Sequence, residues 1–131
     1  MSTHNKNKTI IGVLLSLLFI GIIVAVVFVV RNNQQPGKYD AFAQCLTEND
    51  VTYYGAFWCP NCQRQGNMFG KSKRYVNYIE CSTPNRRDQK TICKEAEIEA
   101  YPTWEFADGS RVTGIQTFEF LAEQTGCTLP E

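Results

Sequence analysis

The stretch YYGAFWCPNCQRQ, residues 53–65, joins an aromatic and apolar run to two cysteines that are separated only by Pro60 and Asn61. The run from Val51 to Trp58 is short and rich in aromatic and β-branched residues, which favours a buried strand. Pro60 suits the first turn of a helix, because its φ is already near the helical value and its missing N–H is not needed there. The stretch therefore predicts a strand that gives way to a helix at Cys59.

Similar signals predict the other elements of an α/β fold. The helices are expected over about 41–48, from Pro60 to near Phe69 or Gly70, over about 87–97 and up to about Thr125, with N-caps at Asp40 and Thr117 and a C′ glycine at Gly126. The further strands are expected at 76–81, 103–106 and 111–114, the last two joined by an Asp-Gly hairpin turn. This order gives a central mixed sheet of about four strands with helices on both faces. It places Cys59 at the carboxyl end of a central strand, where sites form in open α/β sheets.

Residues 9–30, TIIGVLLSLLFIGIIVAVVFVV, carry no charge, and as a helix they would cover about 30 Å. The alternative of a cleaved signal peptide fits poorly, since its apolar region is shorter and VVRNNQQPG offers no A-x-A-like site. A buried core helix would need more cover than so small a domain supplies. We expect a short tail over 1–8, a transmembrane anchor over 9–30, a flexible linker over 31–38 and a folded domain over 39–131.

Composition narrows the class of protein and its location. The 131 residues carry 13 basic and 13 acidic side chains, so nucleic acid is not an expected partner. The basic residues on the two flanks of the apolar segment are too evenly balanced to set its orientation. Six cysteines, however, are many for a reducing compartment. We therefore expect a single-pass protein of the cell membrane whose C-terminal domain lies outside the cytoplasm.

Cys59 and Cys62 are three residues apart, so on a helix they share a face and can close a small disulfide ring. At the helix N-terminus, unpaired N–H groups and the helix dipole favour a thiolate, which is the attacking species. We expect Cys59 to be the exposed nucleophile and Cys62, one turn deeper, the resolving thiol. Pro60 fixes the geometry between the sulfurs, and Asn61 adds no charge.

A cysteine pair at this spacing can also form a structural disulfide or contribute to a zinc site. A purely structural disulfide between neighbours constrains the unfolded chain little. A zinc site needs two more ligands, yet the only histidine, His4, precedes the anchor, and Cys81 and Cys93 do not form a second Cys-x-x-Cys motif. No metal is therefore expected.

Tyr101-Pro102-Thr103 precedes a predicted strand, where a cis proline can make a tight turn. WCPNC and YPT together resemble the thioredoxin superfamily over about residues 39–127, a superfamily in which an aromatic-Cys-x-x-Cys opens a helix and a cis proline faces the pair. More narrowly, YGAFWCPNCQRQGNMFG, YIEC, the later Cys93 and YPTWEFADG resemble the thioredoxin-like domain associated with bacterial vitamin K epoxide reductase homologues.

The resemblance implies a thioredoxin-like fold and a thiol-disulfide oxidoreductase that acts on the thiols of exported proteins. It implies that the backbone beside Pro102 pairs with the substrate strand, and that a quinone-linked membrane enzyme is the redox partner. No bound cofactor is expected. The residues expected to support Cys59 and Cys62 are Trp58, Pro60, Asn61, Tyr101 and Pro102. The family usually has His at the place of Asn61, and Tyr53 stands where thioredoxins proper have a buried Asp.

The other four cysteines are expected to be structural. Cys81 ends a strand and Cys93 lies in the next helix, so a disulfide between them would close a short loop and contribute about 2–4 kcal/mol. Two buried free thiols and an electron relay are the alternatives. Cys45 and Cys127 are paired by elimination, although helices on opposite faces of the sheet would separate them.

The direction of electron flow stays open. An oxidase in a folding pathway is the leading hypothesis, and a reductase or isomerase would use the same pair in another direction. A non-catalytic thioredoxin-like binding module, with the pair permanently oxidised, is the hypothesis from a different class. An intact WCPNC beside YPT argues against the module.

Overall fold

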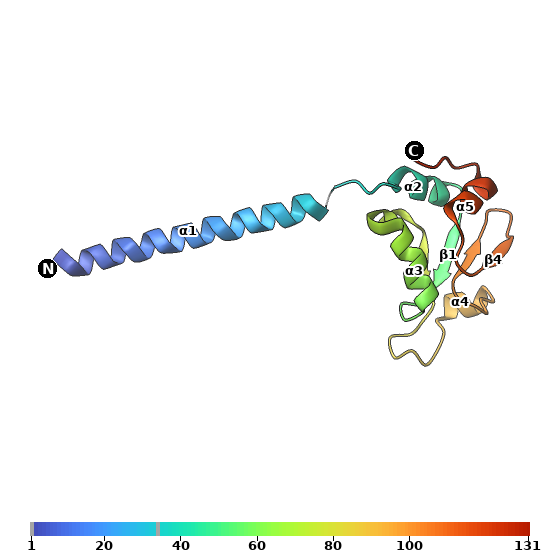
Figure 1. Cartoon of the computed structure of the whole chain (residues 1–131). Coiled ribbons are helices and arrows are strands. Elements are labelled where there is room, and N and C mark those ends of the chain that lie inside the picture. The colour runs from blue at the N-terminus through green and yellow to red at the C-terminus, as the bar shows by residue number, and fades with distance from the viewer. Residues whose placement is uncertain (1, 34) are drawn as a thin grey trace. The chain divides into compact units, whose positions relative to one another are not determined.

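The computed structural model of the chain describes residues 2–33 and 35–131 (Figure 1). Contacts divide it into two compact units, Met1–Gln35 and Pro36–Glu131. The first unit is a helix, and the second carries the sheet and all six cysteines.

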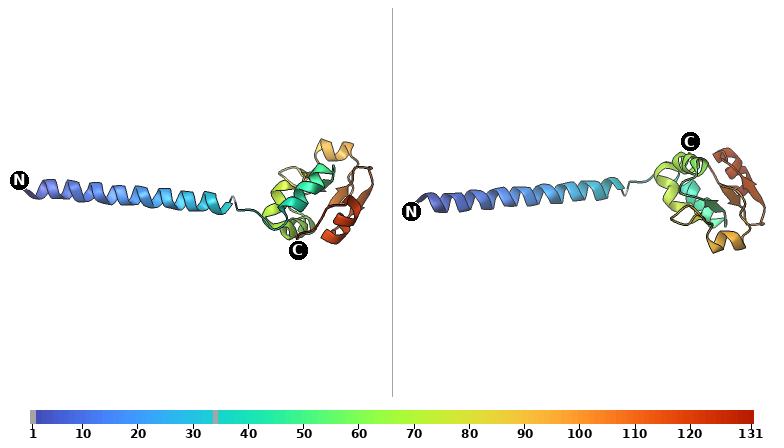
Figure 2. Two further views of the ribbon diagram at one scale, coloured as in Figure 1. Left: turned by 90° about the horizontal axis from the view of Figure 1, so that it is seen from above. Right: turned by 90° about the horizontal axis from the view of Figure 1, so that it is seen from below.

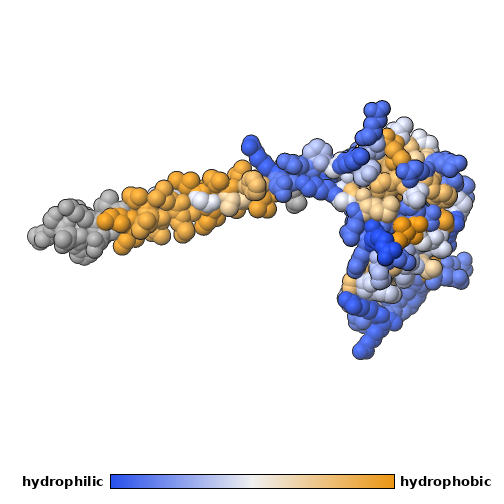
Figure 3. All heavy atoms as spheres, in the orientation of Figure 1, coloured by the Kyte–Doolittle hydropathy of each residue, from blue (hydrophilic) through white to orange (hydrophobic). Residues whose placement is uncertain are grey.

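Helix α1 spans Ser2–Asn33. Within it, Ile10–Asn32 has a mean hydropathy of 3.3 and is long and apolar enough to cross a membrane. Apolar side chains cover most of the visible face of this stretch (Figure 3). The helix continues three residues into the segment expected to be a linker. Nothing in Arg31-Asn32-Asn33 prevents helical hydrogen bonding, and the first strong helix breaker is Pro36.

The second unit has a four-stranded mixed sheet in the order β2-β1-β3-β4, in which β1 is parallel to β2 and antiparallel to β3, and β3 and β4 form a hairpin. Its elements are α2 Asp40–Glu48, β1 Thr52–Gly55, α3 Pro60–Phe69, the 3-10 helix η1 Gly70–Tyr75, β2 Tyr78–Glu80, α4 Thr91–Glu95, β3 Thr103–Glu105, β4 Arg111–Thr113 and α5 Phe118–Thr125. The arrangement is a thioredoxin-like α/β fold, and the predicted fold class is confirmed.

Alternation along β1 separates the core into two parts. Tyr53 points into the larger part, where it stacks on Trp104 with ring centroids 4.5 Å apart, among side chains of α2, α3 and α5. Tyr54 points into the smaller part, which contains Cys81, Cys93 and Ile98 beside α4. Both views of Figure 2 show α2 and α3 side by side. Helices therefore cover both faces of the sheet, three contributing to one core and one to the other.

Aromatic packing ties the three helices of the larger core together. Phe42 of α2 lies 5.4 Å from Phe118 of α5, centroid to centroid, and Phe69 of α3 lies 4.6 Å from Phe118. Such pairs add about 0.5–1.5 kcal/mol each to the area they bury. Helices α2 and α5 thus share a face, contrary to the concern that they would be separated.

Several predicted boundaries were wrong. Strand β1 ends at Gly55 instead of Trp58, because the Cys59 N–H already donates to the Ala56 carbonyl in a turn. Asp40 is the first residue of α2 and not its cap; its carboxylate accepts from the Gly37 N–H and pairs with Arg74 at 3.1 Å. These contacts hold the chain just before the helix.

The predicted helix over 87–97 is also shorter in the structure. Residues 84–88 form turns and bends, and Gln89 and Lys90 are extended because Gln89 bridges to Ser82 and the Lys90 N–H donates to the Cys81 carbonyl at 2.7 Å. The ends of α5 are confirmed: Thr117 caps it by accepting from the Phe120 N–H at 3.1 Å, and Gly126 follows with φ 73°.

Candidate active site

Cys59 is the N-cap residue of α3. Its backbone is extended (φ −73°, ψ 119°), Pro60 occupies the first helical turn, and the Cys59 Sγ accepts the N–H of Cys62 at 3.2 Å. The sulfur therefore occupies the position that a Ser or Asp oxygen takes in an ordinary N-cap. A negative charge on this sulfur would be stabilised by the end of the helix.

The structure shows more cover over Cys59 than we expected. Cys59 is 6% exposed and Cys62 is 4% exposed, so the prediction of an exposed nucleophile is wrong. Tyr101 packs against both cysteines and Ala56. The aromatic residues just before the pair reach the surface, with Phe57 42% and Trp58 40% exposed, as do Pro60 and Asn61 between the cysteines.

The loop before β3 faces the pair. The Tyr101–Pro102 peptide bond is cis, and the Cys59 Sγ lies 3.7 Å from the Tyr101 carbonyl oxygen. The Tyr101 ring meets the Trp58 ring edge to face at 6.4 Å. The structure thus brings Trp58, Cys59, Tyr101 and Pro102 together from two distant parts of the sequence, whereas the Asn61 side chain points into solvent.

A cavity of about 270 Å³ opens beside this loop. Trp58 and Tyr101 form its aromatic walls, and residues 86–88 also line it. Trp58 is held there because its indole N–H donates to the Ser82 hydroxyl at 2.7 Å. The Gln89 amide donates to the Tyr101 hydroxyl, also at 2.7 Å. A peptide approaching Cys59 would find a surface with fixed side chains.

Cys62 lies one helical turn into α3 and is 4% exposed. Burial, followed by its hydrogen bond with Cys59, raises the pKa of the Cys62 thiol to about 12. The Tyr53 hydroxyl donates to the Cys62 carbonyl at 3.0 Å, and burial raises the pKa of Tyr53, so this side chain stays neutral. The Cys62 thiol is therefore protonated at neutral pH and must lose its proton before it can attack.

Sequence reasoning missed the side chains of β2 that lie near Cys62. Tyr78 and Glu80, both on β2, line a smaller cavity together with Cys62. One signal was available: β1 and β2 are parallel neighbours, so the carboxyl end of YIEC had to lie beside the start of α3. The spacing within WCPNC contains no such information.

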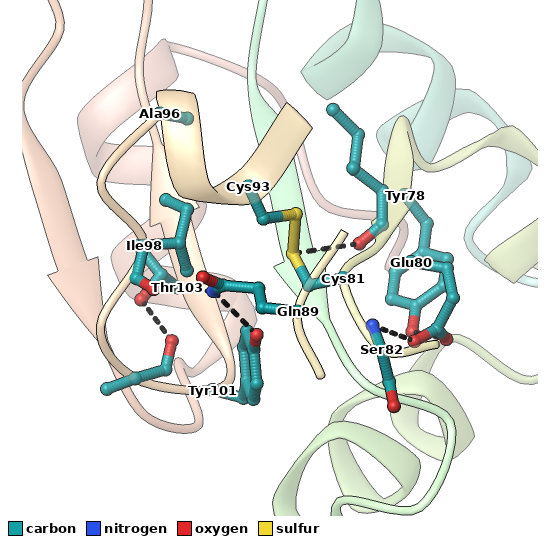
Figure 4. Close-up of a disulfide and its surroundings, with 12 residues drawn as sticks. Tyr78, Glu80, Cys81, Ser82, Gln89, Cys93, Ala96, Ile98, Tyr101 and Thr103 are labelled. Atoms are coloured by element: carbon teal, nitrogen blue, oxygen red, sulfur yellow. Dashed lines mark hydrogen bonds between the residues drawn. A yellow bond between two sulfur atoms is a disulfide. The ribbon is translucent and has the colours of Figure 1, made fainter. Parts of the chain in front are cut away.

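The other four cysteines are bonded. Cys81 and Cys93 are joined across 12 residues, and Cys45 and Cys127 across 82 residues. Cys59 and Cys62 are free thiols. Figure 4 shows the Cys81–Cys93 bridge between Glu80 and Ser82 on one side and Gln89 and Tyr101 on the other. Within residues 2–33 and 35–131, no group of three His, Cys, Asp or Glu side chains is arranged to hold a metal ion.

Comparison with known proteins points to redox chemistry. No family model matches the chain. A thiol-disulfide oxidoreductase, LTO1 of Arabidopsis thaliana, is 37% identical over 95 residues, which is 70% of this chain and 25% of that protein. The chain thus spans about a quarter of the length of this relative. This similarity and the fold together support a place in the thioredoxin-like superfamily.

Proposed function

We propose that the protein is a thiol-disulfide oxidoreductase in which Cys59 is the nucleophile and Cys62 the resolving thiol. The observation that carries the proposal is the position of the Cys59 sulfur, which caps α3 and faces the Tyr101 carbonyl. The similarity to a thiol-disulfide oxidoreductase supports it. So does the contrast between this free pair and the four bonded cysteines.

In the oxidising direction, a client thiolate attacks the Cys59 sulfur of the Cys59–Cys62 disulfide. A client–Cys59 bond forms, the Cys59–Cys62 bond breaks, and Cys62 leaves as a thiol after taking up a proton. A second client thiolate then attacks the client sulfur of the mixed disulfide. The client gains a disulfide, Cys59 leaves as a thiolate, and two electrons have moved to the protein.

The client would bind across the cavity beside Trp58 and Tyr101, with its backbone next to Pro102. The exposed aromatic side chains of Phe57 and Trp58 supply contact area near the sulfur. Trp58, Pro60, Tyr101 and Pro102 thereby position the client and the helix, and Asn61 is the exposed residue between the two thiols.

We also propose that α1 anchors the protein in the cell membrane, with the domain outside the cytoplasm and exported proteins as clients. The length and hydropathy of Ile10–Asn32 support the anchor, and two bonded cysteine pairs support an oxidising compartment. A quinone-linked membrane enzyme of the vitamin K epoxide reductase type would then reoxidise the pair. The motif resemblance supports this partner.

The test is exchange between the full chain in detergent and a glutathione buffer, followed by mapping of the bonds. We expect Cys59 and Cys62 to interconvert between dithiol and disulfide while the other two bridges persist. A Cys59→Ser variant should lose exchange with a dithiol client peptide. Binding of that peptide without any exchange by the native chain would contradict the proposal and support the binding module.

The equilibrium reduction potential of the Cys59–Cys62 pair measures the direction of electron flow. Potentials in this fold range from about −270 mV for reductases to about −120 mV for strong oxidants. A value near the oxidant end would support the folding pathway, and one near the thioredoxin end would favour the reductase.

A further inference from the structure

The proposed exchange leaves one chemical problem unsolved. When Cys62 attacks a mixed disulfide on Cys59 it must first lose a proton, and when it leaves in the opposite direction it must gain one. Its sulfur is buried, so bulk water does not reach it freely. Some group beside Cys62 has to take and return this proton.

A cavity of about 150 Å³ lies on the side of Cys62 that faces β2. Its walls include Cys62, Lys73, Tyr78 and Glu80. A space of this size, with the polar groups of Lys73, Tyr78 and Glu80 among its walls, has room for several water molecules, each of which occupies about 30 Å³ in the liquid. The cavity therefore joins the buried thiol to a carboxylate.

Gly55 explains why the thiol and β2 come so close. A Cβ atom at this position would lie 3.2 Å from the Cys62 Sγ, 3.3 Å from the Tyr78 Oη and 2.8 Å from the Tyr78 Cε2. The sulfur and the hydroxyl thus flank one point that only a glycine leaves empty. Because both groups also line the same cavity, water in it can connect them.

Two hydrogen bonds hold the Glu80 carboxylate beside the cavity. Its Oε2 accepts from the Tyr78 hydroxyl at 2.7 Å, and its Oε1 accepts from the Ser82 N–H at 2.8 Å. Both oxygens accept hydrogen bonds, as those of an ionised carboxylate do. The Ser82 contact fixes the side chain beside the Cys81–Cys93 bridge (Figure 4).

We propose that Glu80 is the proton acceptor and donor for Cys62, acting through the Tyr78 hydroxyl and water in this cavity. The inference rests on the proposed oxidoreductase function. In the resolving step, the Cys62 S–H proton moves along the path to the Glu80 carboxylate. The Cys62 sulfur then bonds to Cys59, the Cys59–client bond breaks, and the client leaves as a thiolate. In the opposite direction, Glu80 returns a proton to the departing Cys62.

The other titratable groups around the cavity fit this assignment. Burial, and then the hydrogen bond to Glu80, raise the pKa of the Tyr78 hydroxyl, so Tyr78 stays protonated and can only pass a proton on. Tyr53, from β1, is kept neutral in the same way. Lys73 places its ammonium 5.5 Å from the Tyr78 ring centroid and favours a negative charge nearby. Glu80 is the only carboxylate among the described residues that line this cavity.

The experiment follows the two half-steps separately in the reduced full chain in detergent. An excess of an aromatic disulfide reagent releases one coloured thiolate when Cys59 attacks it, and a second when Cys62 resolves the adduct. Glu80→Gln should leave the first phase unchanged and slow the second by about 100-fold near neutral pH. The deficit should shrink as the pH rises, because hydroxide can then remove the proton.

Tyr78→Phe removes the hydroxyl but keeps the ring and the Ser82–Glu80 contact, so it should slow the second phase less than Glu80→Gln does. Glu123→Gln, an exposed position on α5, is the matched control and should match the native chain in both phases.

The outcomes separate this inference from the proposed function. Absence of the first phase in the native chain would contradict the function itself. A normal first phase, with a second phase in Glu80→Gln that has the native rate and pH profile, would overturn the role of Glu80 alone. If Glu80→Gln also alters the first phase, Tyr78→Phe decides: a native second phase in that variant would overturn the relay.

Discussion

The six cysteines occupy two kinds of surroundings. Cys81 and Cys93 are fully buried among Tyr54 and Ile98, with apolar side chains around their bond. Cys59, although only 6% exposed, lies at the N-terminus of α3 with the Cys62 N–H directed at its sulfur. Low solvent exposure of a cysteine therefore does not distinguish a structural disulfide from a reactive thiol. The position of the Cys59 sulfur at the N-terminus of α3 does.

The largest effect is expected when each structural disulfide is removed in turn from a chain that also carries Cys59→Ser and Cys62→Ser. In the chain-entropy model, a bond across 82 residues stabilises by about 4–5 kcal/mol and one across 12 residues by about 3 kcal/mol. Replacing Cys45 and Cys127 by serine should thus cost more than replacing Cys81 and Cys93. Urea unfolding of the full chain in detergent measures both, and the reverse order would contradict the loop-length argument.

The next largest effect is expected in the reactivity of the Cys62 thiol. In a Cys59→Ser chain at pH 8, alkylation of Cys62 should be much slower than that of a free thiol, because burial, the largest cause of its raised pKa, persists without Cys59. The folded reduced state holds a proton that the unfolded chain releases above pH 9. Stability should therefore fall more steeply between pH 9 and 12 in the reduced chain than in the oxidised one, where the buried Tyr53 and Tyr78 contribute but Cys62 does not. Alkylation at the free-thiol rate would contradict this environment.

Gly55→Ala tests the space between Cys62 and β2. The new methyl group would lie 2.8 Å from a Tyr78 ring carbon, so we expect a loss of about 1–3 kcal/mol in the free energy of unfolding. Urea titration measures it. Gly21→Ala is the control, since a Cβ there meets nothing within 4 Å. An unchanged midpoint in Gly55→Ala would show that the space is not needed.

The smallest effect is expected at Asn61. In Asn61→His, an imidazolium beside Cys59 should speed its alkylation a few-fold below about pH 6.5, where the ring is charged. The gain should fade as the pH rises above that value. Measuring the rate of alkylation of Cys59 against pH in both chains checks this, with Gln63→His as a nearby control position. A gain that does not change with pH would exclude the charge as its cause.

The fold could be predicted because its signals are local. Alternating and aromatic runs marked the strands, Thr117 and Gly126 marked the ends of α5, and Asp108-Gly109 marked the hairpin. The boundaries that were wrong depended on distant contacts. Gln89 is held extended by Ser82, and the start of α2 is set by Arg74 and Ser72, none of which a window along the chain can contain.

Only part of the candidate site could be predicted from the sequence. WCPNC and YPT located both sides of it, since each motif lies within a few residues. The cover that Tyr101 gives to Cys59, and the place of Glu80 beyond Cys62, depend on which strands are neighbours and on the space left by Gly55. These are properties of packing, and a spacing pattern does not contain them.

The most direct test of the central claim uses a Cys62→Ser chain expressed in cells, where a mixed disulfide can form but cannot be resolved. Adducts would be trapped by acid and mapped by mass spectrometry, beside a Cys59→Ser, Cys62→Ser chain. The account predicts client proteins joined to Cys59 and none in the double variant. Equal trapping in the two chains, or adducts on the other four cysteines alone, would contradict it.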